Sequence, residues 1–470
     1  MMKEPRYQRV KTCAECGMCK SKKTCDPARK PTRPYTGFRW TSDGFDCALP
    51  VAIDSHSVCS FGCLYCFSDN LAQHRQQSQR PIGQTDLRRI DNVFGGKGGK
   101  FGENIRMALK YNNRNEHGYP APVQLGAITD PMDNIERQQG WLLEFIKLAI
   151  KHDQPVRIST KGIMALQGEY LDAFAKKPEL FWVAFSIISP DDKVISQVDR
   201  RAPVTSKRIE AMKNLSDIGV KTSLRFRPIL PGISDATKDH PQAYKDLIDM
   251  AKGAGAKAIS YEVCFLPGMP TDDLRERYKR IEEISGKPLR KIYSSFGKAQ
   301  ACTRASYKWT EGIMWAIHDH AKKKGLQIGV SDPIWKQLSE YGCCCGIRPD
   351  DPVHGNWERE NATNALLRAK RGEIKEIGPE DIIPPWAYKT LAVNLMTPGI
   401  GPKHKYRVRH MTWADELRNK WNDPAHDRGP FVYFQGALRP HREDEDGNVY
   451  YKYVGLKRSD RTEWPYWTVN

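Results

Sequence analysis

Short apolar runs alternate with amphipathic stretches between about residues 47 and 332, and this alternation is the strongest pattern in the chain. Apolar runs rich in β-branched and aromatic side chains predict buried strands, whereas apolar positions three and four residues apart predict helices. A regular succession of such strands and helices is typical of a parallel sheet covered by helices. The predicted strands are 48–54, 123–129, 156–160, 182–188, 222–229, 258–264 and 327–331, and the predicted helices include 136–152, 206–218, 244–253 and 308–324.

The pattern divides the chain into three parts, residues 1–46, 47–335 and 336–470. Residues 1–40 hold eleven Lys and Arg against three Asp and Glu and show no periodicity, which predicts an irregular basic segment. Residues 95–102 are rich in glycine but lack the Gly-Lys-Ser/Thr ending of a phosphate loop. We therefore interpret them as a flexible connector.

Aromatic and basic residues are interleaved in the C-terminal part. Residues 401–470 contain thirteen Lys and Arg and twelve aromatic residues, among them Trp413, Trp421, Trp464 and Trp467. The runs 431–435 and 449–454 have the pattern of strands. The rings either stack on unpaired bases, in a nucleic-acid-binding subdomain, or form the core of a small subdomain.

Composition narrows the class of protein. A chain of 470 residues with 39% hydrophobic residues can bury a full core, which excludes wholesale disorder. The formal net charge of +18 favours a polyanionic partner, nucleic acid first, although a basic surface also serves solubility alone. No apolar run is long enough to cross a membrane and the N-terminus lacks a signal peptide, so we expect a cytoplasmic protein with no membrane partner.

Ten of the thirteen cysteines fall into three tight groups, which in a reducing compartment indicates metal or redox chemistry. Cys59, Cys63 and Cys66 have the spacing Cys-x3-Cys-x2-Cys and closely follow a predicted strand. Three thiolates hold three irons of a four-iron cluster and leave the fourth iron open to a small molecule, whereas electron carriers usually use four thiolates. A structural zinc site is the alternative, but zinc requires a fourth ligand nearby.

This loop resembles the cysteine motif of the radical S-adenosylmethionine superfamily, including an aromatic residue, Tyr65, just before the last cysteine. The resemblance implies a partial (β/α)6-type barrel with an N-terminal Cys-rich segment and a C-terminal basic, Trp-rich extension. It also implies a [4Fe-4S] cluster whose open iron binds S-adenosylmethionine and splits it reductively into methionine and a 5′-deoxyadenosyl radical. The protein then positions the cofactor and the substrate and excludes water. A reductant such as flavodoxin or ferredoxin supplies the electron that reduces the cluster.

Further segments resemble the branch of this superfamily that contains spore photoproduct lyase and DNA repair photolyase-like proteins. They are 126–131 with Glu136 and Arg137, 158–161, 184–187, 200–203 and 225–232. By position, the resemblance implies that Thr129 and Lys161 hold the methionyl part of S-adenosylmethionine and that Ser186 reaches its ribose. The resemblance also implies that Tyr65 lies at the bound S-adenosylmethionine. Each residue also fits a plain role as a strand-end polar group or an ion-pair partner.

One departure separates the chain from spore photoproduct lyases, which are known for a hydrogen-donating cysteine at the end of the second strand. Residues 128–130 are Ile, Thr and Asp here, so reversal of a thymine dimer by that route is not expected. Asp130, Arg225 and Arg227 lie at predicted strand ends, where a carboxylate or a forked guanidinium orients a base or a phosphate. Partnership in a structural salt bridge is the alternative.

The other two cysteine groups predict auxiliary iron–sulfur clusters or zinc sites. The first group consists of Cys13, Cys16, Cys19 and Cys25. The second consists of Cys343, Cys344 and Cys345, with Cys302 as a fourth ligand. Three adjacent residues bind one metal only from a turn, which the flanking glycines permit. The alternatives for this group are buried inert thiols or a redox-active thiol that donates hydrogen to a substrate radical.

The sequence therefore predicts a radical S-adenosylmethionine enzyme that modifies or rearranges a pyrimidine, thymine-derived base in DNA, as in phage-type thymidine hypermodification. The DNA is expected to be single-stranded or to present a flipped base, because the radical must meet an unstacked ring. The cell would be a bacterium or a phage-infected host. The alternatives are a radical enzyme for a peptide or an RNA, a photoproduct-lyase-like repair enzyme, and a DNA-binding zinc protein without catalysis.

Overall fold

The protein is described by a computed structural model that covers the sheet region almost completely. The described residues are 33–35, 37–40, 46–47, 49, 51–66, 68, 83–97, 105, 109, 118–267, 272–293, 302–355, 361–383, 385–388, 411–426 and 429–455. Cys13, Cys16, Cys19, Cys25, Trp464 and Trp467 lie outside this set, as does the side chain of Cys302. The N-terminal auxiliary metal site therefore stays a prediction.

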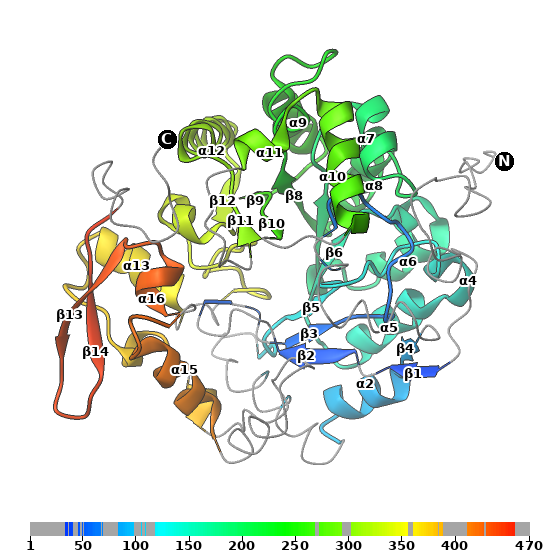
Figure 1. The fold of residues 1–470 in the computed structure, drawn as a ribbon. Coiled ribbons are helices and arrows are strands. Elements are labelled where there is room, and N and C mark those ends of the chain that lie inside the picture. Colours follow the sequence, from blue (N-terminus) through cyan, green and yellow to red (C-terminus); the bar gives the residue numbers. More distant parts are fainter. Residues whose placement is uncertain are drawn as a thin grey trace.

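Seven parallel strands form the centre of the structure (Figure 1). They are β3 (Val51–Ile53), β5 (Val123–Leu125), β6 (Val156–Thr160), β7 (Phe181–Ser186), β8 (Lys221–Ile229), β9 (Ala258–Val263) and β12 (Gln327–Val330). With β2 (Phe38–Trp40), which pairs antiparallel with β3, the order across the sheet is β12-β9-β8-β7-β6-β5-β3-β2. All seven predicted strands are confirmed, and the described strands form an open sheet rather than a closed barrel.

Helices follow the strands along the chain. They are α4 (Glu136–Gln139), α5 (Trp141–Lys151), α6 (Gly168–Ala175), α7 (Asp192–Val198), α8 (Thr205–Asp217), α9 (Ala243–Gly253), α10 (Asp272–Ser285), α11 (Leu289–Ile292) and α12 (Tyr307–Lys323). The predicted helix 136–152 is two helices, because Gly140 adopts a φ of 61° and ends the first. Within the described residues, none of the helices combines the length and the apolarity needed to cross a membrane.

Several short elements surround the sheet. The strand β1 (Arg33–Tyr35) pairs with β4 (Gly83–Thr85), and α2 (Leu87–Phe94) follows and contacts α5. A two-residue ladder joins β10 (Leu266–Pro267) to β11 (Cys302–Thr303). The 3-10 turns are η2 (Met164–Leu166), η3 (Pro178–Leu180), η4 (Pro333–Leu338), η5 (Pro379–Asp381) and η6 (Pro385–Tyr388).

The two faces of the sheet differ in chemistry. The face that packs against helices such as α8 and α9 carries large apolar side chains, for example those of Val183, Leu224 and Ile259, all fully buried. The other face, called the inner face below, carries mainly polar or small side chains in register from strand to strand, together with the buried ring of Trp182, which is in register with Arg157 and donates to Ser223 at 3.2 Å. They include Gln124, Arg157, Ser159, Ala184, Ser186, Ser223, Arg225, Ser260 and Gly329. Because successive strand residues point to opposite faces, this division follows directly from the alternation along each strand.

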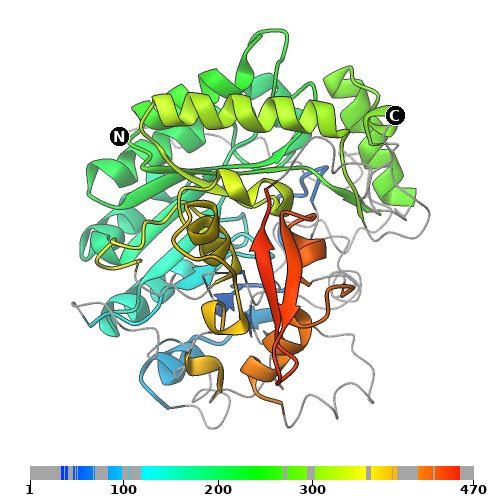
Figure 2. The ribbon, with the colours of Figure 1, turned by 90° about the vertical axis from the view of Figure 1, so that its left-hand side faces the viewer.

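The elements that follow residue 355 form a group beside the sheet, drawn from yellow to red in Figures 1 and 2. They include α13 (Ala362–Lys370), α15 (Trp413–Trp421), α16 (Pro430–Tyr433) and a hairpin of β13 (Leu438–Glu443) and β14 (Val449–Tyr453). The predicted strand 449–454 is confirmed, but the prediction for 431–435 is wrong, because most of this run belongs to α16. Pro430 occupies the first helical position, where its fixed φ suits a helix, and a short apolar run does not distinguish a strand from a buried helix.

Two of the C-terminal tryptophans lie in the core of this group. Trp413 is 6% exposed and Trp421 is 1% exposed. Trp421 donates from Nε1 to the carbonyl oxygen of Val449 at 2.8 Å, and its ring meets that of Tyr451 edge-on. These two rings therefore serve the core of a small subdomain, the second of the two interpretations above, and are not available to stack on bases.

A buried carboxylate, that of Asp46, joins the C-terminal group to the sheet. It forms an ion pair with Nζ of Lys336 in η4 at 2.8 Å, and both side chains are almost inaccessible. It also accepts hydrogen bonds from the backbone N of Thr363 in α13 at 2.9 Å and from the hydroxyl of Tyr433 in α16 at 2.8 Å. Three segments that are distant in sequence therefore converge on one side chain.

Replacing Asp46 by Asn should destabilise the protein strongly. The amide leaves the buried ammonium of Lys336 without a counter-charge, and breaking a buried pair in this way costs about 3–5 kcal/mol. Chemical denaturation followed by tryptophan fluorescence measures the loss in the free energy of unfolding. The double variant Asp46→Asn with Lys336→Met removes both charges and should recover part of the loss. A single variant as stable as the wild type would contradict the assigned network.

A second buried acid, Glu136, lies at the start of α4. Its side chain is inaccessible, and Oε1 accepts hydrogen bonds from the backbone N of Leu142 at 2.9 Å and from the hydroxyl of Tyr170 at 2.6 Å. Burial raises the pKa of this carboxyl to about 7. The folded protein therefore holds a proton that the unfolded chain releases at lower pH.

The raised pKa of Glu136 predicts a pH-dependent loss of stability. The contribution of this carboxyl to the free energy of unfolding is fully present below its pKa in the unfolded chain, about 4.5. It is lost as the pH rises through its pKa in the folded protein, about 7. Relative to Glu136→Gln, the wild type should lose up to about 3 kcal/mol over this window. Denaturation at a series of pH values measures the difference. The exposed control Glu144→Gln should leave the profile unchanged, and a wild-type profile parallel to that of Glu136→Gln would contradict the prediction.

Candidate functional site

The three cysteines of the Cys-x3-Cys-x2-Cys motif lie in an irregular loop directly after β3. Among the described residues none of the three forms a disulfide; Cys63 is buried, and Cys59 and Cys66 are half-buried. Gly62 turns the loop with a φ of 62°, and a Cβ at this position would lie 2.5 Å from the guanidinium of Arg201. Glycine is therefore required here both for the backbone conformation and for the close approach of Arg201.

The loop is held on one side by the segment that follows β5. Oδ2 of Asp133 accepts a hydrogen bond from the backbone N of Ser60 at 2.7 Å, while Oδ1 accepts from the backbone N of Ile135 at 2.9 Å. The hydroxyl of Ser60 accepts in turn from the backbone N of Asn134 at 3.0 Å. Burial raises the pKa of Asp133 to about 7. These reciprocal bonds fix the position of Cys59 relative to the edge of the sheet.

On its other side the loop is held by the segment that follows α7. The backbone N of Leu64 donates to the carbonyl oxygen of Val198 at 2.9 Å, and Nε of Arg200 donates to that of Gly62 at 3.0 Å. The hydroxyl of Tyr65 donates to Asp199. The loop is therefore fixed through its backbone and through the side chain of Tyr65.

Asp199 itself belongs to a fully buried ion pair. Its carboxylate lies 2.7 Å from Nη2 of Arg208 in α8, and neither side chain is accessible. Burial alone would raise the pKa of Asp199, but the charges of Arg208 and Lys161 outweigh it and lower the pKa below its usual value. Asp199 is therefore ionised, and its carboxylate accepts the hydrogen bond that the Tyr65 hydroxyl donates. Tyr65, predicted to lie at the cofactor, fixes the cysteine loop through this bond.

The ends of β3, β5 and β6 are tied together by two further carboxylates. Oδ1 of Asp54 accepts hydrogen bonds from the backbone N atoms of residues 127, 128 and 129, at 3.0, 2.8 and 3.1 Å. Asp130 accepts from the hydroxyl of Thr160 at 2.7 Å and from the backbone N of Lys161 at 2.6 Å. Asp130, predicted as catalytic, thus holds the backbone at Lys161, and it also accepts from the backbone N of Met132 at 2.9 Å.

Lys161 and Thr129, predicted to bind the methionyl part of S-adenosylmethionine, lie next to the cysteine loop. Nζ of Lys161 lies 5.4 Å from the centre of the Tyr65 ring, a cation–π contact. Its charge also acts on the Cys63 thiol. The hydroxyl of Thr129 donates to the carbonyl oxygen of His56 at 3.2 Å. The structure therefore brings these two predicted residues and the three cysteines to the same edge of the sheet.

The donor set of this loop fits an iron–sulfur cluster with one open iron. The loop offers three thiols, while the nearby carboxylates of Asp130 and Asp133 are committed to backbone hydrogen bonds. Burial and the charge of Asp133 raise the pKa of Cys59, and a cation beside this thiol would favour its thiolate form. A four-iron cluster takes one thiolate on each of three irons, and the loop offers three thiols.

Ser186, Arg225 and Arg227 lie on the inner face at the ends of β7 and β8. Nη1 of Arg225 donates to the hydroxyl of Ser186 at 3.1 Å, and the two residues are in register. Arg227 forms a long ion pair with Glu262 of β9 at 3.5 Å. The predicted ribose contact, Ser186, is therefore oriented by one of the predicted arginines. The other predicted arginine takes part in a salt bridge.

Cys343, Cys344 and Cys345 lie in a turn packed on the inner face. The backbone N of Gly346 donates to the carbonyl oxygen of Cys343 at 2.9 Å, and Gly346 has a φ of 74°. The hydroxyl of Ser260 in β9 donates to the carbonyl oxygen of Cys344 at 2.6 Å. The turn that three adjacent ligands require is present. Among the described side chains, no group of three or more His, Cys, Asp or Glu residues is arranged to hold a metal ion here. A metal at this turn stays a prediction.

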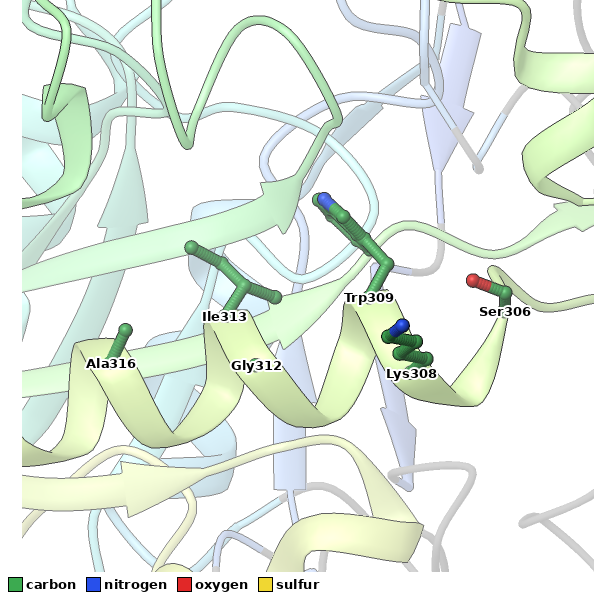
Figure 3. A pocket seen from close by; sticks show the side chains of 6 residues that line it. All are labelled: Ser306, Lys308, Trp309, Gly312, Ile313 and Ala316. Atoms are coloured by element: carbon green, nitrogen blue, oxygen red, sulfur yellow. The ribbon is translucent and has the colours of Figure 1, made fainter.

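A separate groove runs along the first turns of α12 and has a volume of about 520 Å³ (Figure 3). Its lining is formed by Ser306, Lys308, Trp309, Gly312, Ile313 and Ala316. The indole of Trp309 donates to Asp235 at 3.2 Å. Because Lys308 is the one ionisable side chain of this lining, we place the candidate site at the cysteine loop rather than here.

The sequence analysis missed the carboxylates that hold the site together. Asp54, Asp133 and Asp199 were not singled out, nor was Arg208. One signal was present for Asp54, which is the first polar residue after a buried apolar strand. The other three gave no local signal: Asp133 and Asp199 hold the loop through residues that are distant in sequence, and Arg208 acts through its ion pair with Asp199. Arg157 of the inner face was also missed, although its charge interrupts a buried strand.

Comparisons with known proteins were made for the sequence and for the structure. The model of the Radical SAM superfamily matches residues 54–240. Two curated relatives are the uncharacterized proteins Rv2578c of Mycobacterium tuberculosis and Mb2609c of Mycobacterium bovis. Each is 22% identical to this chain over 215 residues, which are 45% of this chain. The chain spans 58% of the length of these relatives.

Solved structures with a related arrangement of elements include spore photoproduct lyases. A variant of that enzyme has a TM-score of 0.45 at 15% identity, covering 63% of this chain and 79% of its own. A complex of the enzyme with dinucleoside spore photoproduct has a TM-score of 0.41 at 15% identity, covering 59% and 76%. The radical methyltransferase TsrM from Kitasatospora setae has a TM-score of 0.38 at 10% identity, covering 68% and 61%.

The family model spans the cysteine loop, both segments that hold it and the strands from β5 to β8. Its range begins at Asp54, at the end of β3, and ends in the segment after β8. Residues 54–240 of this chain are therefore a domain of the Radical SAM superfamily.

Proposed function

We propose that this chain is a radical S-adenosylmethionine enzyme that modifies or rearranges a pyrimidine, thymine-derived base in DNA. The observation that carries the proposal is the loop of three neighbouring cysteines held at the sheet edge, with Lys161 and Thr129 beside it. Cys59, Cys63 and Cys66 would hold the [4Fe-4S] cluster. With S-adenosylmethionine bound and one electron delivered by an external reductant, such a cluster would supply the radical chemistry that removes hydrogen from an unreactive C–H bond.

The chain's own residues position the cofactor and keep water away from it. Lys161 supplies an ammonium group for the methionine carboxylate, and its contact with the Tyr65 ring restricts its direction. Ser186 supplies a hydroxyl for the ribose and is oriented by Arg225. Phe61 and Leu64, both buried, cover the loop with apolar surface. Such a site performs its task by holding reactive groups in one geometry.

Two features support DNA as the substrate. The net charge of +18 provides long-range attraction for a polyanion. The segments between residues 126 and 232 resemble the photoproduct-lyase branch, whose solved members include one in complex with a dinucleoside photoproduct. The segment after β5 carries no cysteine between residues 126 and 135, which favours base modification over dimer reversal. A phage-type thymidine hypermodification fits these features.

The cysteine loop gives the first test of this function. Replacing Cys59, Cys63 or Cys66 by Ala should reduce the iron content and abolish cleavage of S-adenosylmethionine to 5′-deoxyadenosine under strong reductant, because the cluster loses a ligand. Iron analysis and chromatography of the nucleoside measure both effects in anaerobically purified protein. The control Cys47→Ala removes a cysteine outside the loop and should keep both the iron content and the cleavage. Cleavage retained by the loop variants refutes the ligand assignment.

The substrate class gives a second test. For single-stranded oligothymidylate, the logarithm of the affinity should fall linearly with the logarithm of the salt concentration, with a slope of about −2 for roughly three phosphate contacts. Fluorescence anisotropy across a salt series measures this slope. A peptide nucleic acid of the same sequence has a neutral backbone and should show none. Equal, salt-independent binding of both polymers argues against a DNA substrate.

A further inference from the structure

Three arginines of β6 and β8 share the inner face of the sheet. Arg157 is 1% exposed and donates to Oε1 of Gln124 at 2.8 Å and to the hydroxyl of Ser159. Arg225 and Arg227 are half-buried at the other end of the face. None of the three has a full-strength carboxylate partner among the described residues, since the Arg227 to Glu262 distance is 3.5 Å.

These guanidinium groups leave several nitrogen atoms unsatisfied. Within the described part of the chain, Nε and Nη2 of Arg157, Nε of Arg225 and Nε of Arg227 are buried and have no hydrogen-bond partner. Leaving a buried donor unpaired is costly, and the cost is larger for a charged group. Most buried polar groups find a partner in the native protein or in a ligand.

The charges on this face are also unbalanced. The charges of Arg227 and Arg157 act on Arg225, and Glu262 is the carboxylate that faces Arg225 and Arg227. Burial opposes the charge of Arg227, but Cys344, Glu262 and Cys345 outweigh it and raise the pKa of this group. Burial, together with the charges of Arg227 and Arg157, lowers the pKa of Arg225 to about 9. An excess of positive charge in a half-buried site is unfavourable when it has no counter-charge. An anion that binds there supplies the counter-charge, so the same excess strengthens the binding of anions.

Three guanidinium groups on one face favour the binding of an oxyanion. Their planar, forked donors match the oxygens of a phosphate in a bidentate manner and hold their charge at any physiological pH. Arg225 lies toward the edge that carries the cysteine loop, because it contacts Ser186 at the end of β7. An anion bound there lies next to the group predicted to hold the ribose of the cofactor.

We propose that Arg225 and Arg227, with Arg157 behind them, form an oxyanion site for the phosphate of the nucleotide whose base is modified. The inference rests on the proposed function and names the part of the substrate that this face recognises. The phosphate fixes the nucleotide on the inner face, and the base then lies toward the cysteine loop. The methionine carboxylate of the cofactor has the same chemistry and is the competing source of the anion.

The test compares two small ligands that differ by one charge. The anaerobically purified full chain is titrated with the dinucleotide dTpT and with its methylphosphonate analogue, which is neutral and of nearly the same shape. The wild type should bind dTpT at least about tenfold more tightly than the analogue. In Arg227→Gln this preference should fall to less than about threefold, and in Arg227→Lys, which keeps the charge but loses the fork, to an intermediate value.

A matched control and a cofactor titration complete the experiment. Arg275→Gln removes an exposed arginine of α10 and should keep the full preference for dTpT. If Arg227→Gln keeps that preference, or if it weakens S-adenosylmethionine binding while dTpT binding is unchanged, the phosphate assignment is overturned. The thermal melting of each variant shows that it is folded, and the intermediate Arg227→Lys variant keeps the test decisive if Arg227→Gln unfolds. Failure of the proposed function is recognised separately, by absent iron and absent cofactor cleavage in the wild type.

Discussion

The structure of the site depends on two buried carboxylates, Asp133 and Asp199, that hold the cysteine loop from opposite sides. The loop has no helix or strand of its own, so its shape comes from hydrogen bonds to other segments. A buried carboxylate is costly to desolvate, and here backbone N–H groups offset the cost for Asp133 while Arg208 offsets it for Asp199. The spacing of the three thiols is therefore a product of the whole domain.

The parallel sheet explains why these groups meet. The carboxyl ends of parallel strands lie along one edge, and the polar residues that follow β3, β5 and β6 are brought together there. Asp54 and Asp130 then tie adjacent loops to one another at backbone level. This arrangement lets Thr129 and Lys161 approach the cysteines although they are separated from them by long stretches of sequence.

The two faces of the sheet have different roles, one in packing and the other in presenting polar and charged groups. The apolar face packs against helices and contributes buried apolar side chains to the hydrophobic core. The inner face carries the charged and hydroxyl groups, and the turn of Cys343, Cys344 and Cys345 packs on it where Ser260 holds its backbone. Gly329 has no room for a Cβ beneath this turn, since one would lie 2.5 Å from the carbonyl oxygen of Cys344. The C-terminal group is joined to this assembly through Asp46.

The sequence by itself determined the strands, most helices and the cysteine motif, because these depend on side chains close together along the chain. The exceptions are instructive: Gly140 divides a predicted helix, and the run 431–435 is largely helical because its four apolar residues suit either structure. Only the tertiary structure decided the roles of Asp199 and Arg157. Asp199 contacts Tyr65 across 134 residues of sequence, and no local pattern encodes a contact of that separation. Likewise, the surplus of charge on the inner face exists only once neighbouring strands bring its arginines together.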